Sequence, residues 1–326
     1  MVEVQRLSGA LARIVVPTPF PVGPVNAYLV DAGEPALIDV GPSTDEAWAA
    51  IVDGLGQLGR APEDVRRLVV THGHLDHFGL AHRLPNARVH VHVDDIHATA
   101  RFRGWIETRL GEYESVGRLW GIPAEYHGAF RALFEMYAPM APDLPLDRIA
   151  PLLGNRETLR LGDLALDILH CPGHTEGLVC FHARDEKLLF AGDHLLQDIT
   201  PNPNVYVPLY RGRRTGLAHY LESLSTIESL DVATILPGHG APYTGVRDRV
   251  AEIRRHHEER KSQVLGIVRE RDRSVVGVVR TIWRELPPDG FYLALREVHG
   301  HLELLEEEGR VAREMRDGVA RFRAIA

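Results

Sequence analysis

The stretch VVTHGHLDHFG, residues 69–79, places three histidines and one aspartate within six positions, directly after a run of β-branched residues. The alternating positions of His72, His74 and Asp76 cannot come from one face of a helix, where neighbouring side chains are three or four residues apart. On a loop that leaves a strand, these side chains and the adjacent His77 spread toward two neighbouring points. This pattern predicts a site for a pair of metal ions.

Two metal ions need more donors than this loop provides, because a catalytic zinc commonly takes three protein ligands and keeps one position for water. Downstream, HCPGHTEG offers His174, FAGDHLL offers Asp193 and ILPGHGAP offers His239. Each follows an apolar, strand-like segment and lies in a glycine-containing loop, as expected of residues that converge at strand ends. Cys171 and Cys180 are too few for a thiolate cage, so we expect nitrogen and oxygen ligands.

Short apolar segments and amphipathic stretches form two series around these motifs. The first contains ARIVV, NAYLVD, ALIDVG and VRRLVV with helical spacing over 44–58, and the second contains LALDILH, LVCFHA, KLLFAGD and VATILPGHG with helical spacing over 217–229. Two facing sheets with helices outside would bury both series at once. We therefore predict an α/β fold, an αββα sandwich, over residues 1–246.

Residues 97–150 interrupt this rhythm with helical spacing and little strand character. Eight of the chain's twenty-two aromatic residues fall between Phe102 and Tyr137. They predict a helical insertion that forms its own core, caps a pocket, or does both. If the insertion caps a pocket, its candidate substrate contacts are Trp105, Trp120 and Phe134.

Residues 247–326 are predicted to form a separate C-terminal domain. Three helical segments precede Asp317-Gly318, which lies between two alternating runs and is a strong hairpin signal. Three helices and a hairpin predict a winged-helix domain. Its third helix, residues 291–308, carries Arg296 against five glutamates, a net charge of −4 that repels phosphates. We expect this domain to pack on the first domain or to mediate a homodimer.

The composition, with 44% hydrophobic and 25% charged residues, is that of a folded globular protein. The net charge of −8 disfavours nucleic acid as a partner, since basic residues are only slightly segregated. The sequence contains no apolar run of about 20 residues, as a membrane span requires, and no signal peptide pattern. We expect a cytoplasmic protein with no membrane partner, and two cysteines fit a reducing compartment.

The motifs THGHLDH, PGHT, GDH and PGHG, in this order, resemble those of the metallo-β-lactamase-fold hydrolases over essentially all of residues 12–246. The resemblance implies two zinc ions, with iron or manganese as alternatives. The implied ligands are His72, His74 and His174 for one metal, Asp76, His77 and His239 for the other, and Asp193 as a bridge between them. Asp39 in ALIDVG matches the family's first motif and would orient a loop without touching metal.

The resemblance also implies hydrolysis by a hydroxide that bridges the two metals, because bound cations lower the pKa of water toward neutrality. Asp76 and Asp193 would act by holding this centre, since a liganded carboxylate is not a free base. The loop after Asp193 offers Tyr206, Tyr210 and Arg211, which either contact substrate or are solvated. A small ester, lactone or thioester with an apolar portion is the expected substrate.

Two alternative activities stay open at this point. The winged-helix extension resembles that of an endoribonuclease subgroup, which keeps cleavage of single-stranded RNA as an alternative. A persulfide dioxygenase with a single iron shares much of the motif.

Three other functions are disfavoured. β-Lactam hydrolysis is disfavoured because Asp193 stands where those enzymes commonly have cysteine. Flavo-diiron chemistry is disfavoured because His74 stands where those proteins have glutamate. A non-catalytic binding module is disfavoured by the complete ligand set.

Overall fold

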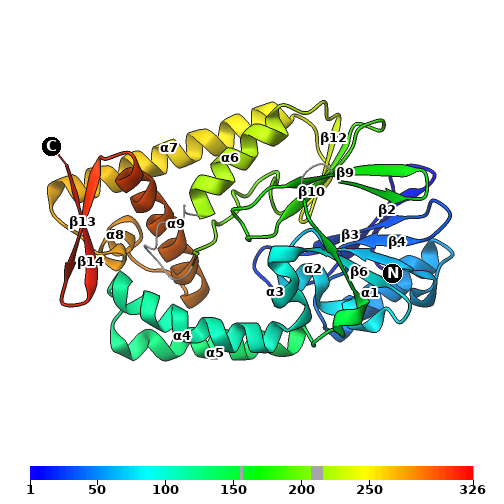
Figure 1. Ribbon diagram of the computed structural model, residues 1–326, viewed down its shortest axis with the longest axis horizontal. Helices are drawn as coiled ribbons and strands as arrows, with labels where there is room; N and C mark the ends of the chain where they lie inside the picture. Colours follow the sequence, from blue (N-terminus) through cyan, green and yellow to red (C-terminus); the bar gives the residue numbers. More distant parts are fainter. Residues whose placement is uncertain (155–156, 207–215, 326) are drawn as a thin grey trace.

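The computed structural model describes residues 1–154, 157–206 and 216–325, apart from the side chains of a few residues in the helices of the insertion and of the C-terminal region. Two sheets form the body of the protein (Figure 1). The first has the order β1-β2-β3-β4-β5-β6-β7, with strands Val4–Arg6, Leu11–Val16, Val25–Val30, Ala36–Ile38, Arg67–Val69, Arg88–His92 and Ile149–Leu152. The second has the order β12-β11-β10-β9-β8, with strands Thr234–Pro237, Leu188–Gly192, Val179–Ala183, Leu164–His170 and Thr158–Leu161.

The central strands are buried on both faces, which explains their nearly continuous apolar sequences. Tyr28 and Ile38 of the first sheet and Phe181 of the second belong to one core between the sheets. Helix α1 (Asp45–Gln57) covers the outer face of the first sheet, and helix α6 (Gly216–Glu228) covers that of the second. The predicted αββα sandwich is confirmed.

The strand directions bring the ends of distant segments to one edge. Strands β4, β5 and β6 are parallel, so their carboxyl ends lie side by side. In the second sheet β11 is parallel to β12, and β9 has the same direction because both β9 and β11 are antiparallel to β10. Polar residues that follow these strands are therefore collected at the same edge of the sandwich, where sites of α/β proteins commonly form.

The insertion between β6 and β7 is helical, with α3 (Ile96–Ala100), α4 (Phe102–Trp120) and α5 (His127–Tyr137). Helices α4 and α5 run side by side from the sandwich to the C-terminal region (Figure 1). Ile106 and Leu110 of α4 are buried in the core of the sandwich, whereas Val116 and Trp120 are buried in the core of the C-terminal region. The insertion therefore joins the two parts of the protein.

The C-terminal region contains α7 (Val246–Glu270), α8 (Val275–Ile282), α9 (Pro288–Glu307) and a hairpin of β13 (Val311–Arg316) and β14 (Val319–Ala324). Asp317 and Gly318 have φ values of 53° and 76°, as a two-residue hairpin turn of this twist requires. The three helices and the hairpin lie where the sequence predicts them. Their assignment as a winged helix, and a role in dimerisation, stay predictions. Among the described residues, no helix combines the length and apolar character needed to span a membrane.

Candidate metal centre

The loop after β5 presents the first four donors. His72 and His74 alternate along the chain, and Asp76 and His77 lie in the short helix α2 (Leu75–Phe78), which begins directly after His74. His174 lies in the loop after β9, Asp193 follows β11 and His239 follows β12. Each donor thus lies beyond the carboxyl end of a strand, where the topology gathers them.

All seven expected ligands come together at this edge. Within the group of His72, His74 and His174, one nitrogen from each residue lies within 4.8 Å of the others, and the same holds for one donor atom each from Asp76, His77 and His239. Asp193 lies between the two groups, with Oδ2 3.7 Å from His174 Nε2 and 3.6 Å from His239 Nε2. The arrangement has the form of two three-residue groups that share one carboxylate.

Several donor atoms at the centre are buried without a hydrogen bond in the described chain. They are the Nε2 atoms of His77, His174 and His239, and Oδ1 of Asp193. Leaving such atoms buried without a partner costs free energy, so their convergence fits one or more divalent cations. Imidazole nitrogens and carboxylate oxygens suit zinc, and also iron or manganese.

The opposite ring nitrogens of two of these histidines are held by fixed acceptors. His174 Nδ1 lies 2.9 Å from the Asn202 carbonyl oxygen, and His239 Nδ1 lies 2.8 Å from that of Pro24. A proton on Nδ1 leaves Nε2 as the lone-pair nitrogen that faces the centre. The backbone therefore selects the tautomer that can bind a metal.

Asp39 plays the corresponding role for His77. Its carboxylate lies 2.8 Å from His77 Nδ1 and accepts hydrogen bonds from the Thr71 backbone N–H and hydroxyl, both at 2.8 Å. Its φ of 58° is in the left-handed region, which aspartate tolerates better than most residues. Asp39 thus lies behind the ligands, as the sequence motif implies, and orients both His77 and the start of the ligand loop.

Burial and neighbouring charges set the protonation states of the ligand residues. Burial lowers the pKa of His72 and His74 well below the ordinary value, so both rings are neutral, the form that coordinates metals. Burial opposes ionisation of Asp193, but the neighbouring His239 and His77 outweigh it and keep its pKa well below the usual range. Burial also opposes the charged form of His77, but Asp193 and Asp39 outweigh it and raise its pKa, so this ring must lose a proton before Nε2 can bind a cation.

Asp95, which none of the sequence motifs indicated, connects two ligand loops. Its buried carboxylate accepts hydrogen bonds from Gly73 N and Thr175 Oγ1, both at 2.7 Å, and from Gly177 N at 3.1 Å. A Cβ at Gly177 would lie 2.7 Å from Asp95 Cγ, so this close approach requires glycine. The position of Asp95 just after β6, beside β5 in a parallel sheet, was the signal that could have identified it.

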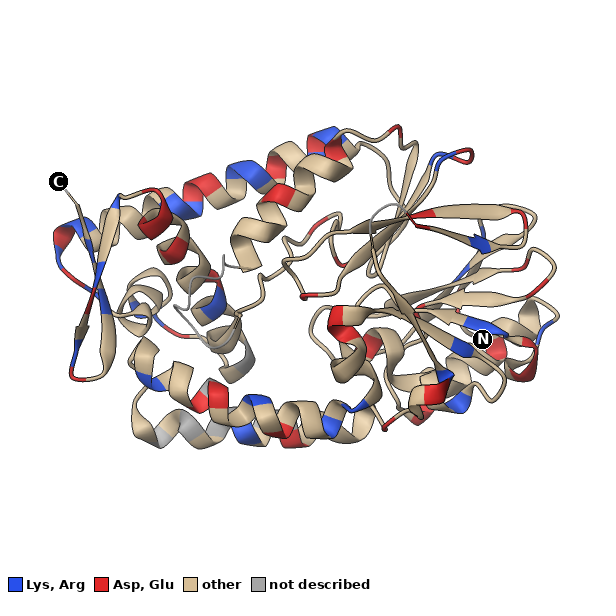
Figure 2. Ribbon diagram, in the orientation of Figure 1, with Lys and Arg blue, Asp and Glu red and all other residues tan. Residues whose placement is uncertain are grey.

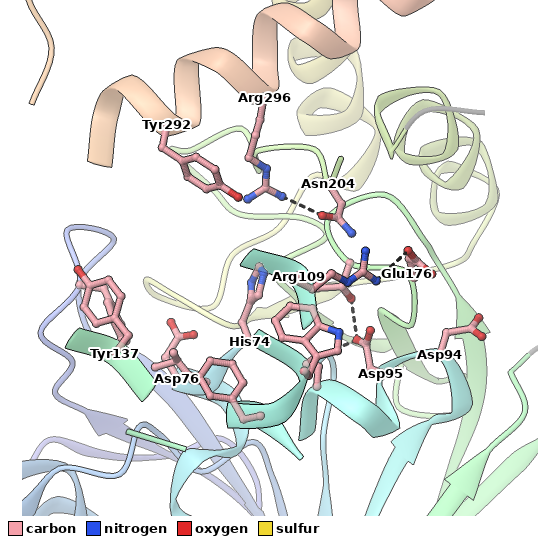
Figure 3. Close-up of a pocket in the computed structure, with 17 residues that line it drawn as sticks. His74, Asp76, Asp94, Asp95, Arg109, Tyr137, Glu176, Asn204, Tyr292 and Arg296 are labelled. Atoms are coloured by element: carbon pink, nitrogen blue, oxygen red, sulfur yellow. Dashed lines mark hydrogen bonds and ion pairs between the residues drawn. The ribbon is translucent and has the colours of Figure 1, made fainter. Parts of the chain in front are cut away.

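A cavity of about 210 Å³ opens beside the centre (Figure 3). His74 and Asp76 line it on the side of the metal ligands. Its apolar wall is made by Phe20, Phe102, Trp105 and Tyr137, and its polar lining includes Arg109, Asn204, Tyr292 and Arg296. Trp105 therefore lies at the cavity, as expected, and helix α9 contributes two residues that the sequence did not mark as candidates.

The other expected substrate contacts lie elsewhere. Trp120 is 1% exposed and packs in the C-terminal core, with its ring 5.3 Å from that of His299, so the prediction that it lines the pocket is wrong. Tyr206 does not line the cavity in the described chain, and its hydroxyl lies 3.3 Å from His219 Nδ1. The Phe134 side chain, Tyr210 and Arg211 are outside the described residues.

Residues 20–239 match the family model described as the metallo-beta-lactamase superfamily. The chain belongs to this superfamily of metallo-hydrolases, which confirms the prediction from its motifs. It is 28% identical over 299 residues to the probable metallo-hydrolase YqjP of Bacillus subtilis, a match that covers 90% of this chain and 92% of the relative.

Two further comparisons cover nearly the whole chain and less than half of it, respectively. A crystal structure of a beta-lactamase domain protein from Burkholderia ambifaria superposes with a TM-score of 0.81 at 27% identity, over 99% of this chain and 94% of that one. The acyl-coenzyme A thioesterase MBLAC2 of Homo sapiens is 33% identical over 145 residues. That match covers only 43% of this chain and 46% of the thioesterase.

Proposed function

We propose that this protein is a metal-dependent hydrolase that cleaves thioesters with a small, partly apolar acyl group. The observation that carries the proposal is the cavity in which His74 and Asp76 of the metal group meet the apolar wall of Phe102 and Trp105. Such a cavity can hold an apolar acyl group beside the cations. The partial similarity to a human acyl-coenzyme A thioesterase supports the thioester over other esters.

The seven ligand residues would hold two divalent cations, which supply Lewis acidity and acidify coordinated water. The neutral rings of His72 and His74 donate lone pairs, and Asp39 keeps the His77 ring in one orientation. The apolar wall excludes bulk water and positions the acyl group. A thiol leaves readily as its thiolate, because its pKa of about 8.5 is far below that of an alcohol.

The first test is the metal content of the purified protein. We expect about two equivalents of zinc, iron or manganese, and about one equivalent in the single variants His74→Ala and His239→Ala, which each remove a donor from a different group. His97→Ala, which alters an exposed histidine of α3, serves as the control. Well under one equivalent in the wild-type protein would refute a metal-dependent activity, and one iron with oxygen consumption would favour a dioxygenase.

The second test compares acyl thioesters, lactones, aryl esters and a short single-stranded RNA as substrates. Thioester hydrolysis is expected to be lost with a chelator, restored by the metal and abolished in Asp193→Ala. Cleavage of RNA alone, abolished by the same substitution, would overturn the proposal. The charge distribution makes that outcome unfavourable, because basic and acidic residues alternate along α7 (Figure 2).

A further inference from the structure

Helix α9 supplies one side of the substrate cavity. Arg296 and Tyr292, one helical turn apart, reach from α9 toward His74 (Figure 3). Arg296 is only 8% exposed. The C-terminal region therefore places a buried cation beside the metal ligands of the sandwich.

The hydrogen bonds of Arg296 in the described chain go to neutral groups. Nε donates to the Pro203 carbonyl oxygen at 3.0 Å, and Nη2 donates to Asn204 Oδ1 at 3.3 Å. The ring of Tyr292 lies 5.5 Å from the guanidinium carbon. Within the described parts of the chain, no carboxylate forms an ion pair with Arg296. Burial of a guanidinium with neutral partners alone is costly, which favours an anionic ligand at this position.

Arg109, in the same cavity, provides a contrast. Its guanidinium lies 3.7 Å from a Glu176 oxygen and 3.6 Å from a Glu112 oxygen, and it stacks over Trp105. Within the described residues, carboxylates balance the charge of Arg109, whereas none balances that of Arg296. Two arginines line the cavity, and the structure leaves only Arg296 without an acidic partner in the described chain.

Arg296 lies in the same cavity as two residues of the metal group. His74 and Asp76 line this cavity together with Arg296. An anion bound by Arg296 would thus lie near the reacting centre, within the length of a small substrate.

We infer that Arg296 binds an anionic group of the substrate, a carboxylate or a phosphate, while the apolar part of the substrate lies against Phe102 and Trp105. A guanidinium presents parallel N–H groups that match the oxygens of either anion. This inference rests on the proposed function, and it names the part of the thioester that the protein selects. Arg296 is a specificity residue supplied by the C-terminal region.

Arg296 also has a structural role that the test must separate from binding. The segment it holds, 203–204, continues from Asn202, whose carbonyl oxygen accepts from His174, and Asn204 N donates to the Gly173 carbonyl oxygen at 2.6 Å. A substitution that moved this segment would disturb a metal ligand. Such damage lowers the hydrolysis of all substrates alike, whereas loss of an anion site lowers only that of charged substrates.

The experiment therefore uses pairs of thioesters that differ in one charged group. The carboxylate pair is the acetyl thioesters of 3-mercaptopropionate and 3-mercaptopropionamide, and the phosphate pair is acetylphosphopantetheine and acetylpantetheine. The wild-type protein is expected to prefer the charged member of one pair, which identifies the anion. Arg296→Gln is expected to lower kcat/KM for that member by about tenfold or more relative to its neutral partner.

Two further variants complete the design. Arg296→Lys retains the positive charge but lacks the paired N–H groups of a guanidinium, and it is expected to keep part of the preference for the charged thioester. Arg255→Gln removes the same charge from an exposed position of α7 and is expected to leave the preference unchanged. Absence of a charge preference in the wild-type protein, or an equal loss for both members of the pair in Arg296→Gln, would overturn the inference.

Failure of the proposed function is distinguishable from failure of the anion site. If the wild-type protein hydrolyses no thioester, the proposed function is wrong, and the site is tested by thermal unfolding with glutarate and with inorganic phosphate. One of these anions is expected to raise the Tm of the wild-type protein and to have a much smaller effect on Arg296→Gln. Equal shifts in both proteins, or no shift in the wild-type protein, would refute the site.

Discussion

The Asp95 carboxylate accepts a hydrogen bond of 2.7 Å from the hydroxyl of Thr175, a residue 80 positions away in the sequence. The same carboxylate accepts hydrogen bonds from the backbone N–H groups of Gly73 and Gly177. One side chain thus joins the ligand loop of the first sheet to that of the second. The separation of His74 and His174 depends on this junction.

We expect Asp95→Asn to weaken zinc binding by about 10- to 100-fold, the range found when partners behind metal ligands are replaced. The amide has nearly the same size but presents N–H groups to N–H donors, which forces the loops apart. Competition with a chromophoric chelator measures the affinity. Thr175→Val removes only one of the three hydrogen bonds and should have a smaller effect. Unchanged zinc affinity in Asp95→Asn would show that the loops keep their spacing without it.

Asp39→Asn tests the orientation of His77. Asparagine tolerates the positive φ of this position, so the backbone should be retained. Asparagine keeps one acceptor oxygen for the Thr71 N–H, but its NH2 group replaces the oxygen that faces His77 Nδ1, so we expect metal affinity to fall by about 10- to 100-fold. The control is Asp31→Asn, which removes the partner of Arg60 outside the ligand group. Equal effects of the two substitutions would contradict this role.

Trp105 and Trp120 of the same helix should respond in opposite ways to truncation. Trp105→Ala enlarges the cavity and is expected to raise KM for apolar thioesters, with a smaller loss of stability than Trp120→Ala because Trp105 is only partly buried. Trp120→Ala leaves a void in the C-terminal core and should lower the free energy of unfolding by about 3–5 kcal/mol, with KM unchanged for the folded fraction. Urea unfolding and steady-state kinetics on both variants distinguish these effects.

Two buried histidines of the C-terminal region predict acid sensitivity. Burial lowers the pKa of His257 to about 3 and that of His301 to about 4, whereas both titrate near 6.5 when unfolded. The unfolded chain therefore binds more protons over this window. Their contribution to stability is complete above about pH 6.5 and falls as the pH is lowered toward 4, by about 1.4 kcal/mol per pH unit for each ring.

Urea unfolding at several pH values between 7 and 4 measures this loss. His257→Gln, which cannot take up a proton, should show a shallower dependence than the wild-type protein. His256→Gln, one position away with a side chain 40% exposed, is the control. Parallel curves for His257→Gln and the wild-type protein would assign the acid sensitivity to other groups.

The ligand set could be predicted because its signals are local. The alternation from His72 to Asp76 has meaning only on a loop after a strand, and the topology of the sheets then brings the strand ends together. Asp95 also follows the end of a parallel strand, so the same rule could have predicted it. Aromatic spacing, in contrast, shows that a helix is amphipathic but not which core it enters, and this ambiguity caused the error for Trp120.

Tyr292 and Arg296 illustrate a limit of another kind. Their helix has the apolar periodicity of a packing element and an acidic composition. The sequence therefore predicted that α9 repels nucleic acid, but not that it lines a substrate cavity. Their contact with the cavity comes from the docking of α9 across the open edge of the sandwich, through residues far apart along the chain. No spacing within residues 288–307 records that docking.

Helix α4 is embedded at both ends, with Ile106 in one core and Trp120 in the other. A helix of 19 residues is about 28 Å long and resists compression, so it acts as a strut between the sandwich and the C-terminal region. This helix fixes the distance between Trp105 on its own surface and Arg296 on α9. The length of a single helix therefore limits the length of an acceptable substrate, from its apolar end to its charged end.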